Sequence, residues 1–212
     1  MKRVLDPVER SSEIIFGLIM ALSFTGILSV ASAGRQSVRD MLVAAVGCSA
    51  AWGLVDGVMY VITNMLLRTR ELSELRAVRA ASDPTAAARL IEAALPEGVA
   101  GAFSPAEIAR VHARLQSLPE PPRVSGVTKA DVLGALACFL LVMVATLPVA
   151  APFAFVDDAR RALRISNAVA IVLLFASGVS LGAWSGYRPV RAGLVVVFVG
   201  VVLTALTIAL GG

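Results

Sequence analysis

The sequence is 212 residues long, which would suit one ordinary soluble domain. Hydrophobic residues make up 58% of it and charged residues only 16%, where soluble proteins carry roughly 45–50% and about 25%. Because a soluble globule has too little interior to hide this apolar excess, the composition excludes the soluble, nucleic-acid-binding and disordered classes of protein. The net charge of +4 then indicates membrane orientation or contact with anionic lipid headgroups.

Five stretches are apolar over the about 20 residues that a membrane-spanning helix needs. They lie at residues 14–33, 42–66, 132–156, 165–184 and 192–210. The block between the second and third stretches is polar and holds many of the charged residues and the single histidine. We therefore predict an all-α integral membrane protein with five transmembrane helices and a small cytoplasmic helical insert. Residues 1–66 carry the first two spans, 67–131 the insert, and 132–212 the last three spans.

The distribution of basic residues orients these spans. Lys and Arg are enriched in the cytoplasmic segments next to membrane helices. With the N-terminus inside, only five of the 19 basic residues face outward, namely Arg35, Arg39, Arg160, Arg161 and Arg164. We therefore expect the N-terminus and the insert in the cytoplasm and the C-terminus outside, in a membrane of the bacterial inner-membrane type. This implies the lipid bilayer as a partner and does not imply nucleic acid.

The start of the chain has a second interpretation. Ala31-Ser32-Ala33 follows an apolar run and is typical of a signal-peptidase site. Acidic residues before the first span cancel the basic ones, however, and Asp6-Pro7 is typical of an N-cap followed by proline at the first helical position. We therefore expect an uncleaved helix that runs from this point into the membrane.

Within the insert, the charge signs of residues 68–80 alternate at helical spacing. Asp83-Pro84 and Ser104-Pro105 each place an N-cap residue before a proline, which predicts two further helices, to Leu95 and Leu118. Three short amphipathic helices can pack as a small bundle. The insert also contains weak metal-ligand candidates, for which a solvated helix face is the better explanation because they are not tightly spaced: Glu92, Glu97, Glu107 and His112.

Asp56 is the one ionisable side chain deep within a predicted span. An intramembrane carboxylate is costly and by default suggests a functional site. Together with a thioether and hydroxyl groups on the same helix face, this carboxylate can hold a dehydrating cation or relay a proton. The alternative is a packing role for Asp56, supported by Gly53-x-x-x-Gly57, a motif at which helices approach closely. Three- and four-residue steps place further candidates on the same face, namely Met59, Tyr60 and Thr63.

Two residues of the first span are further transport candidates. Glu13 stands at its cytoplasmic mouth and can guide cations inward, although charges at helix entrances are commonplace. Met20 lies about 9 Å from the start of the span at 1.5 Å per residue, and methionines in membrane helices are usually filler. Near the C-terminus, a four-residue spacing predicts a face on which another helix packs closely, through Gly178, Gly182 and Gly186.

The sequence contains no pattern typical of an enzyme. Cys48 and Cys138 lie within apolar runs without the spacing of a disulfide framework or a zinc site, and we expect both to be small buried apolar residues. Walker loops, glycine-rich dinucleotide turns, nucleophile elbows and His-Glu-x-x-His motifs are absent. We therefore expect no enzymatic activity and no permanently bound cofactor.

Short motifs at both ends of the chain carry a family resemblance. The last three spans contain Gly134-Ala135-Leu136, Leu147-Pro148, Pro152-Phe153, Leu181-Gly182, the run 185–194, and Gly200 with Thr204. With five spans and an insert between the second and third, these stretches resemble the vacuolar iron transporter family. That family's FGLNDGL motif is similar to Phe16-Gly17-Leu18-Ile19-Met20-Ala21-Leu22 of the first span.

The resemblance implies a homodimer that exports Fe(II), or a similar divalent cation such as Mn(II), from the cytoplasm by proton antiport. It also implies a translocation site formed by an aspartate of the first span and a methionine of the second. Here Met20 stands where the family has that aspartate, and Asp56 lies near the position expected of the methionine. The insert also lacks the family's run of metal-binding glutamates.

One hypothesis is an exchange of partners, in which Met20 and Asp56 on neighbouring antiparallel helices rebuild a site of one acid and one thioether. We therefore expect transport of a divalent cation, with the ion as substrate. The rival hypothesis is a divergent relative that keeps the scaffold without transporting metal, and whose basic insert binds a partner or anionic lipid.

Overall fold

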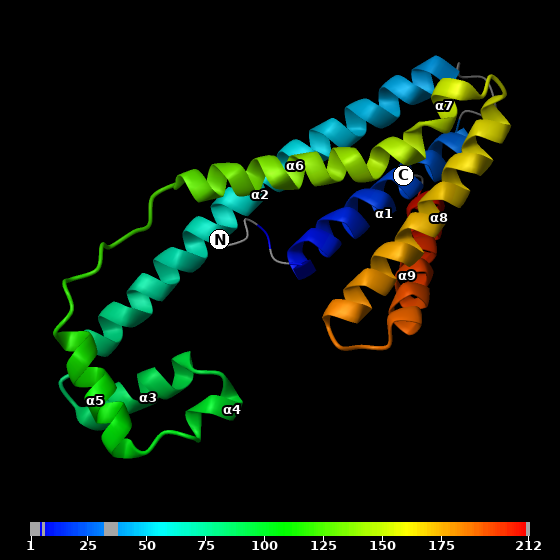
Figure 1. Ribbon diagram of the computed structural model, residues 1–212. Coiled ribbons are helices and arrows are strands. Elements are labelled where there is room, and N and C mark those ends of the chain that lie inside the picture. The colour runs from blue at the N-terminus through cyan, green and yellow to red at the C-terminus, as the bar shows by residue number, and fades with distance from the viewer. Residues whose placement is uncertain (1–4, 6, 32–37, 211–212) are drawn as a thin grey trace. The chain divides into compact units, whose positions relative to one another are not determined.

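The structure, a computed structural model, describes residues 5, 7–31 and 38–210. Within them every regular element is a helix and no strand occurs. The expected N-cap Asp6 and the signal-peptidase residues Ser32 and Ala33 lie outside the described residues. The prediction of an all-helical chain with five apolar spans is confirmed. The spans are α1 (Pro7–Ala31), α2 (Val38–Ala80), α6 (Lys129–Ala150), α8 (Ala159–Trp184) and α9 (Pro189–Ala209) (Figure 1).

The chain forms two compact units, residues 1–60 with 129–212 and residues 61–128. Helix α2 belongs to both, because it continues unbroken past residue 67, where we expected the insert to begin. Its 43 residues extend about 65 Å at 1.5 Å per residue, against about 30 Å for the apolar layer of a bilayer. Only part of α2 can therefore lie in that layer.

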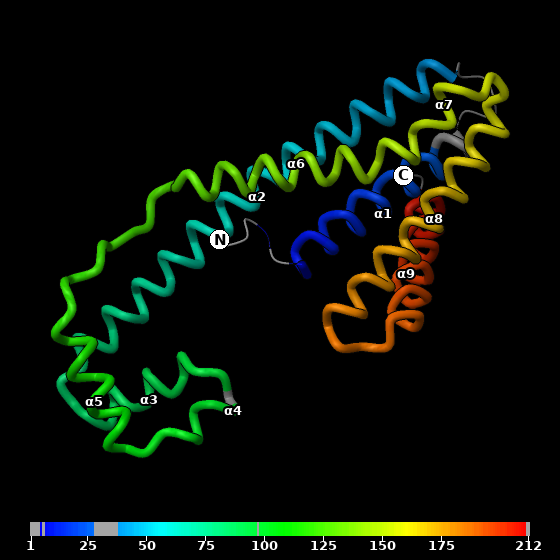
Figure 2. Tube along the Cα trace, viewed as in Figure 1, coloured from blue at the N-terminus to red at the C-terminus, as the bar shows by residue number. Residues whose placement is uncertain are grey.

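In the first unit, α8 and α9 form an antiparallel hairpin, and α1 packs against α6, α8 and α9 (Figures 1 and 2). The core between them includes Leu18 and Leu22 of α1 and Leu174 of α8, all buried. Outside this core the helices expose large apolar side chains, and Phe198 of α9 is 69% exposed. Helices with an apolar exterior around a small core are suited to lipid surroundings.

Glycines bring α8 and α9 into backbone contact, as their four-residue spacing predicts. A Cβ added at Gly178 would lie 2.8 Å from the Cα of Gly193, and one at Gly182 would lie 2.7 Å from the Cβ of Ala192. The prediction of close helix packing is wrong at Gly186, because open space surrounds this residue and its φ is +69°. It follows the end of α8, so the left-handed backbone of the turn before α9, not helix packing, favours glycine there.

The third span ends at its prolines. Helix α6 continues through Pro148 and stops at Ala150, and the short helix α7 (Pro152–Phe155) follows, as expected of two prolines in close succession. The hydroxyl of Ser166 donates a hydrogen bond of 2.6 Å to the carbonyl of Val149. This carbonyl is in the last turn of α6, where intrahelical partners are missing. The Ser166 side chain of α8 thus supplies a hydrogen bond to a backbone carbonyl at the end of α6.

The second unit is a small bundle of α3 (Pro84–Ala94), α4 (Glu97–Ala100), α5 (Pro105–Gln116) and the end of α2. Two of the three expected short helices are present as α3 and α5, whereas residues 68–80 form the end of the long α2 and not a separate short helix. Helix α4 was not predicted, because one helical turn is too short to show a periodic pattern. The core takes one residue each from α2, α3 and α5, namely Val78, Ile91 and Ile108.

Side-chain caps start the two longer helices of this unit where the sequence predicts them. The Asp83 carboxylate accepts hydrogen bonds from the backbone N–H groups of Thr85 and Ala86. Ser104 and Glu107 form a capping box, in which each side chain accepts from the other residue's backbone N–H. Both predicted helix starts are confirmed.

His112 does not lie on the exposed face where the sequence placed it. Its imidazole is half-buried, and Nε2 lies 2.9 Å from the carbonyl oxygen of Val78. The ring therefore docks α5 against the end of α2. The apolar stripe of α5 could not predict this contact, because the partner is a backbone carbonyl of another helix.

Replacing Gly178 by alanine should destabilise the protein by about 1–3 kcal/mol, the usual cost of overpacking, because the new Cβ meets the backbone of Gly193. Gly47→Ala is the matched control, since Gly47 is also helical and has open space around it. That control should be neutral or slightly stabilising. Thermal unfolding in detergent measures both variants, and equal stabilities would contradict a close contact between α8 and α9.

Hydrogen bonds from the hydroxyl and backbone N–H of Ser104 hold the pKa of the Glu107 carboxyl below its ordinary value of 4.5. Because folding lowers this pKa, the stabilisation is complete above the unfolded value and is lost as the pH falls through the folded one. Glu107→Gln keeps an oxygen for the cap and should remove this acid sensitivity.

The measurement is hydrogen exchange of the first amides of α5, corrected for the intrinsic effect of pH. The parent should open as the pH falls below about 4.5, whereas Glu107→Gln should not. The same opening in both proteins would show that the Glu107 carboxylate does not stabilise this helix start.

Candidate functional site

Asp56 lies on α2 between two glycines that bring this helix onto α6. A Cβ at Gly57 would lie 2.9 Å from the carbonyl oxygen of Ala135, and one at Gly53 would lie 3.1 Å from the ring of Phe139. The two backbones therefore approach closely beside Asp56. The Oδ2 atom of Asp56 is buried and has no hydrogen-bond partner among the described residues.

Helices α1 and α2 run antiparallel, and their contacts set a register (Figure 1). The rings of Phe16 and Trp52 meet edge to face with centroids 5.9 Å apart, and Met20 lines one cavity with Cys48. The same register sets Glu13 opposite residue 55, next to Asp56. The two carboxylates interact electrostatically, and the Cys138 thiol of α6 lies within range of both.

The charge around this site is negative. Neither Glu13 nor Asp56 forms an ion pair with a described residue, and Glu9, about one turn earlier in α1, adds negative charge near Glu13. We call Glu13 and Asp56 the acidic pair. Within the described residues, no group of three or more His, Cys, Asp or Glu side chains is placed to hold a metal ion. One chain therefore contributes an acidic pair without a complete coordination sphere.

The other candidates of α2 face elsewhere. Met59 is 51% exposed and Thr63 is also exposed, whereas the ring of Tyr60 packs over Gly134 of α6. Steps of three and four residues at 100° per residue spread the predicted stripe over a wide arc. Its members therefore do not share one environment, and the prediction of a single functional face is corrected to Asp56 with its glycines.

Met20 and Asp56 are not brought together. Met20 shares a cavity with Cys48, which stands eight residues, or about 12 Å along the helix, from Asp56. The exchange of partners proposed from the sequence is therefore corrected, since Glu13 is the first-span residue beside Asp56.

The metal candidates of the insert do not converge either. Glu92 is exposed, the Glu107 carboxylate accepts from Ser104, and His112 bonds to the Val78 carbonyl. The side chain of Glu97 lies outside the described residues. A structural role explains Glu107 and His112.

Sequence reasoning missed Asp131, which is only 3% exposed in the first turn of α6. The predicted span began one residue later, so Asp131 was counted with the polar insert. Its helical spacing from Gly134 and Cys138, both buried, is a signal that could have placed it on the packed face. Unlike the Oδ2 atom of Asp56, Asp131 is not without an interaction partner.

Comparison with known proteins yields no family: no family model and no curated protein matches this sequence. The resemblance to the vacuolar iron transporters therefore remains a prediction from the short motifs of the sequence.

Because the buried Oδ2 atom of Asp56 has no hydrogen-bond partner among the described residues, we expect this functional candidate to lower the stability of the protein. Asp56→Leu should raise the free energy of unfolding by about 1–3 kcal/mol, because it removes a buried oxygen that has no hydrogen bond. Asp131→Asn, nearly isosteric, should instead lower stability, since Asp131 does have a partner. Thermal unfolding in one detergent compares them. A destabilised Asp56→Leu would mean that the Asp56 carboxylate is satisfied and structural.

Proposed function

We propose that this protein is a membrane transporter that moves a divalent transition-metal cation, such as Fe(II) or Mn(II), out of the cytoplasm in exchange for protons. The proposed site is the acidic pair, Glu13 and Asp56. The observation that supports it most is the buried Oδ2 atom of Asp56, which has no partner among the described residues.

The chemistry of two neighbouring, half-buried acids supports exchange. An ionised carboxylate in apolar surroundings costs several kcal/mol unless a positive charge compensates it. A proton or a metal ion can supply that charge, and each excludes the other from the same oxygen. Carboxylate oxygens suit Mn(II) and are common ligands of Fe(II). Competition at Asp56 would therefore couple cation movement one way to proton movement the other way.

The number of ligands supports a homodimer. The acidic pair matches the charge of a divalent ion, but a Mn(II)- or Fe(II)-type ion prefers about six ligands, and no third acid or histidine joins the pair within the described residues. Water or the same residues of a second copy would complete the sphere. We propose a dimer on this ground and on the family resemblance.

The proposed direction follows from the distribution of charge. With the N-terminus and the insert in the cytoplasm of a bacterial-type cell, Glu13 stands six residues into α1, about 9 Å from the cytoplasmic end. A cation would then reach Glu13 first and Asp56 next to it. The outward path lies along the α1–α2 contact.

The alternative is a scaffold or regulatory module that transports nothing. The absence of a three-ligand group among the described residues favours it, and its basic insert would bind a partner or anionic lipid. Two arginines of the insert, however, already donate to backbone carbonyls, since Arg76 bonds to Arg123 and Arg79 to Pro119. A scaffold also gives no reason to keep an unpaired acid beside a second acid.

Proteoliposomes that contain the purified protein and a metal-sensitive dye test the transporter. Asp56→Asn and Glu13→Gln should each slow Fe(II) or Mn(II) flux by about 100-fold, since removing one charged ligand from a desolvated site costs about 3 kcal/mol or more. Proton counterflow should fall equally. Met59→Leu is the matched control on the exposed side of α2 and should keep the parent rate. Flux unchanged in both acid variants would refute this site, and a parent that moves neither ion would favour the scaffold.

A further inference from the structure

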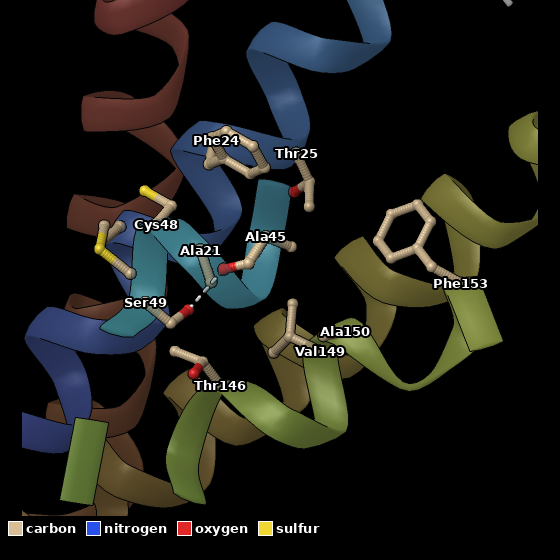
Figure 3. Close-up of a pocket in the computed structure, with 11 residues that line it drawn as sticks. Ala21, Phe24, Thr25, Ala45, Cys48, Ser49, Thr146, Val149, Ala150 and Phe153 are labelled. Atoms are coloured by element: carbon tan, nitrogen blue, oxygen red, sulfur yellow. Dashed lines mark hydrogen bonds between the residues drawn. The ribbon is translucent and has the colours of Figure 1, made fainter. Parts of the chain in front are cut away.

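A second polar feature of the first unit is a small cavity between α1, α2, α6 and α7, distinct from the acidic pair. Its volume is about 10 Å³, enough for one water-sized sphere. Figure 3 shows side chains from these helices turned around it, with hydroxyl groups and a sulfur among otherwise apolar groups. The lining residues with a hydroxyl group or a sulfur atom are Met20, Thr25, Cys48, Ser49 and Thr146.

The three hydroxyl groups of this cavity already donate their protons in hydrogen bonds within the protein. Each donates a hydrogen bond of 2.7–2.9 Å to an oxygen of the protein. The pairs are Thr25 with the side-chain oxygen of Asn167, Ser49 with the carbonyl of Ala45, and Thr146 with the carbonyl of Val142. A hydroxyl that donates elsewhere offers only lone pairs to what it faces. The cavity therefore has electron-pair donors and lacks hydroxyl protons to give.

Two sulfur-containing residues complete this lining from α1 and α2. Met20 of α1 contributes a thioether, and Cys48 of α2 contributes a free, half-buried thiol. Thioether and thiolate are soft ligands that select Cu(I) over hard cations. Cu(I) is satisfied by two or three ligands, so two sulfurs suffice where a divalent ion would need more. We propose that this cavity binds a soft monovalent cation of the Cu(I) class through Met20 and Cys48.

Charge balance agrees with a monovalent ion. On binding, the Cys48 thiol loses its proton to solvent and forms a sulfur–copper bond, while the Met20 thioether donates a lone pair without losing a proton. Copper stays Cu(I), so no electron is transferred. One thiolate and one Cu(I) make a neutral complex, which an apolar helix bundle tolerates. A divalent ion would leave an uncompensated positive charge there.

The cavity size also selects a bare ion. A volume of about 10 Å³ holds one sphere of water size and excludes a hydrated metal ion. Hard cations such as Mg²⁺ give up their water reluctantly, whereas sulfur ligands replace the water of a soft ion. This site is independent of the proposed transport, because Cys48 lies about 12 Å from Asp56 along α2.

Competition with the chromophoric chelator bicinchoninate, under anaerobic reducing conditions, measures Cu(I) binding by the purified full chain in detergent. The parent should bind one Cu(I) per chain, and X-ray absorption should show sulfur ligands from two residues. Met20→Leu and Cys48→Ser should each weaken binding by about tenfold to 100-fold, the range seen even for outer-shell changes at metal sites. Both keep side-chain volume closely, and thermal unfolding without copper verifies their fold.

Two controls make the outcome decisive. Cys138→Ala removes the only other thiol, which is fully buried, and should leave Cu(I) affinity unchanged. Asp56→Asn should also leave it unchanged, so failure of metal export does not count against this site. The proposal is overturned if the parent binds no Cu(I), if Met20→Leu binds as tightly as the parent, or if Cys138→Ala is the variant that loses binding.

Discussion

An ionised carboxylate without a counter-charge costs several kcal/mol inside an apolar helix bundle, and the buried Oδ2 atom of Asp56 has no hydrogen-bond partner among the described residues. The chain forms no described ion pair with Asp56 and sets a second acid, Glu13, within electrostatic range. Two acids that repel each other in such a layer are stabilised by a positive charge, and no described residue forms an ion pair with either of them. The proposed exchange of a metal ion for protons would supply this charge.

Close helix packing positions this site. Gly53 and Gly57 let α2 approach the backbone of α6 on either side of Asp56. Further along α2, Cys48 and Met20 of α1 line a cavity with soft sulfur donors and hydroxyl lone pairs. The α1–α2 contact thus offers hard oxygen ligands at one level and soft sulfur ligands at another. In these proposals a divalent cation would bind at the acidic pair and a soft monovalent cation at the cavity.

Local patterns predicted the five apolar helices and the caps at Asp83 and Ser104, because hydropathy and N-cap chemistry depend on a few neighbouring residues. Asp56 was also found locally, as an acid in an apolar run. The pairing of Glu13 with Asp56 was not, because it depends on the register of α1 on α2, set by long-range contacts such as Phe16 with Trp52. Asp131 was missed for a related reason, since burial at a span boundary depends on neighbouring helices.

In the proposed exchange, a metal ion and protons compete for the carboxylate of Asp56. Calorimetric titration of Mn(II) into the purified protein, repeated in buffers of different ionisation enthalpy, counts the protons released when the ion binds. We expect proton release by the parent that is lost or sharply reduced in Asp56→Asn. Binding without proton release, or equal release from parent and variant, would contradict it.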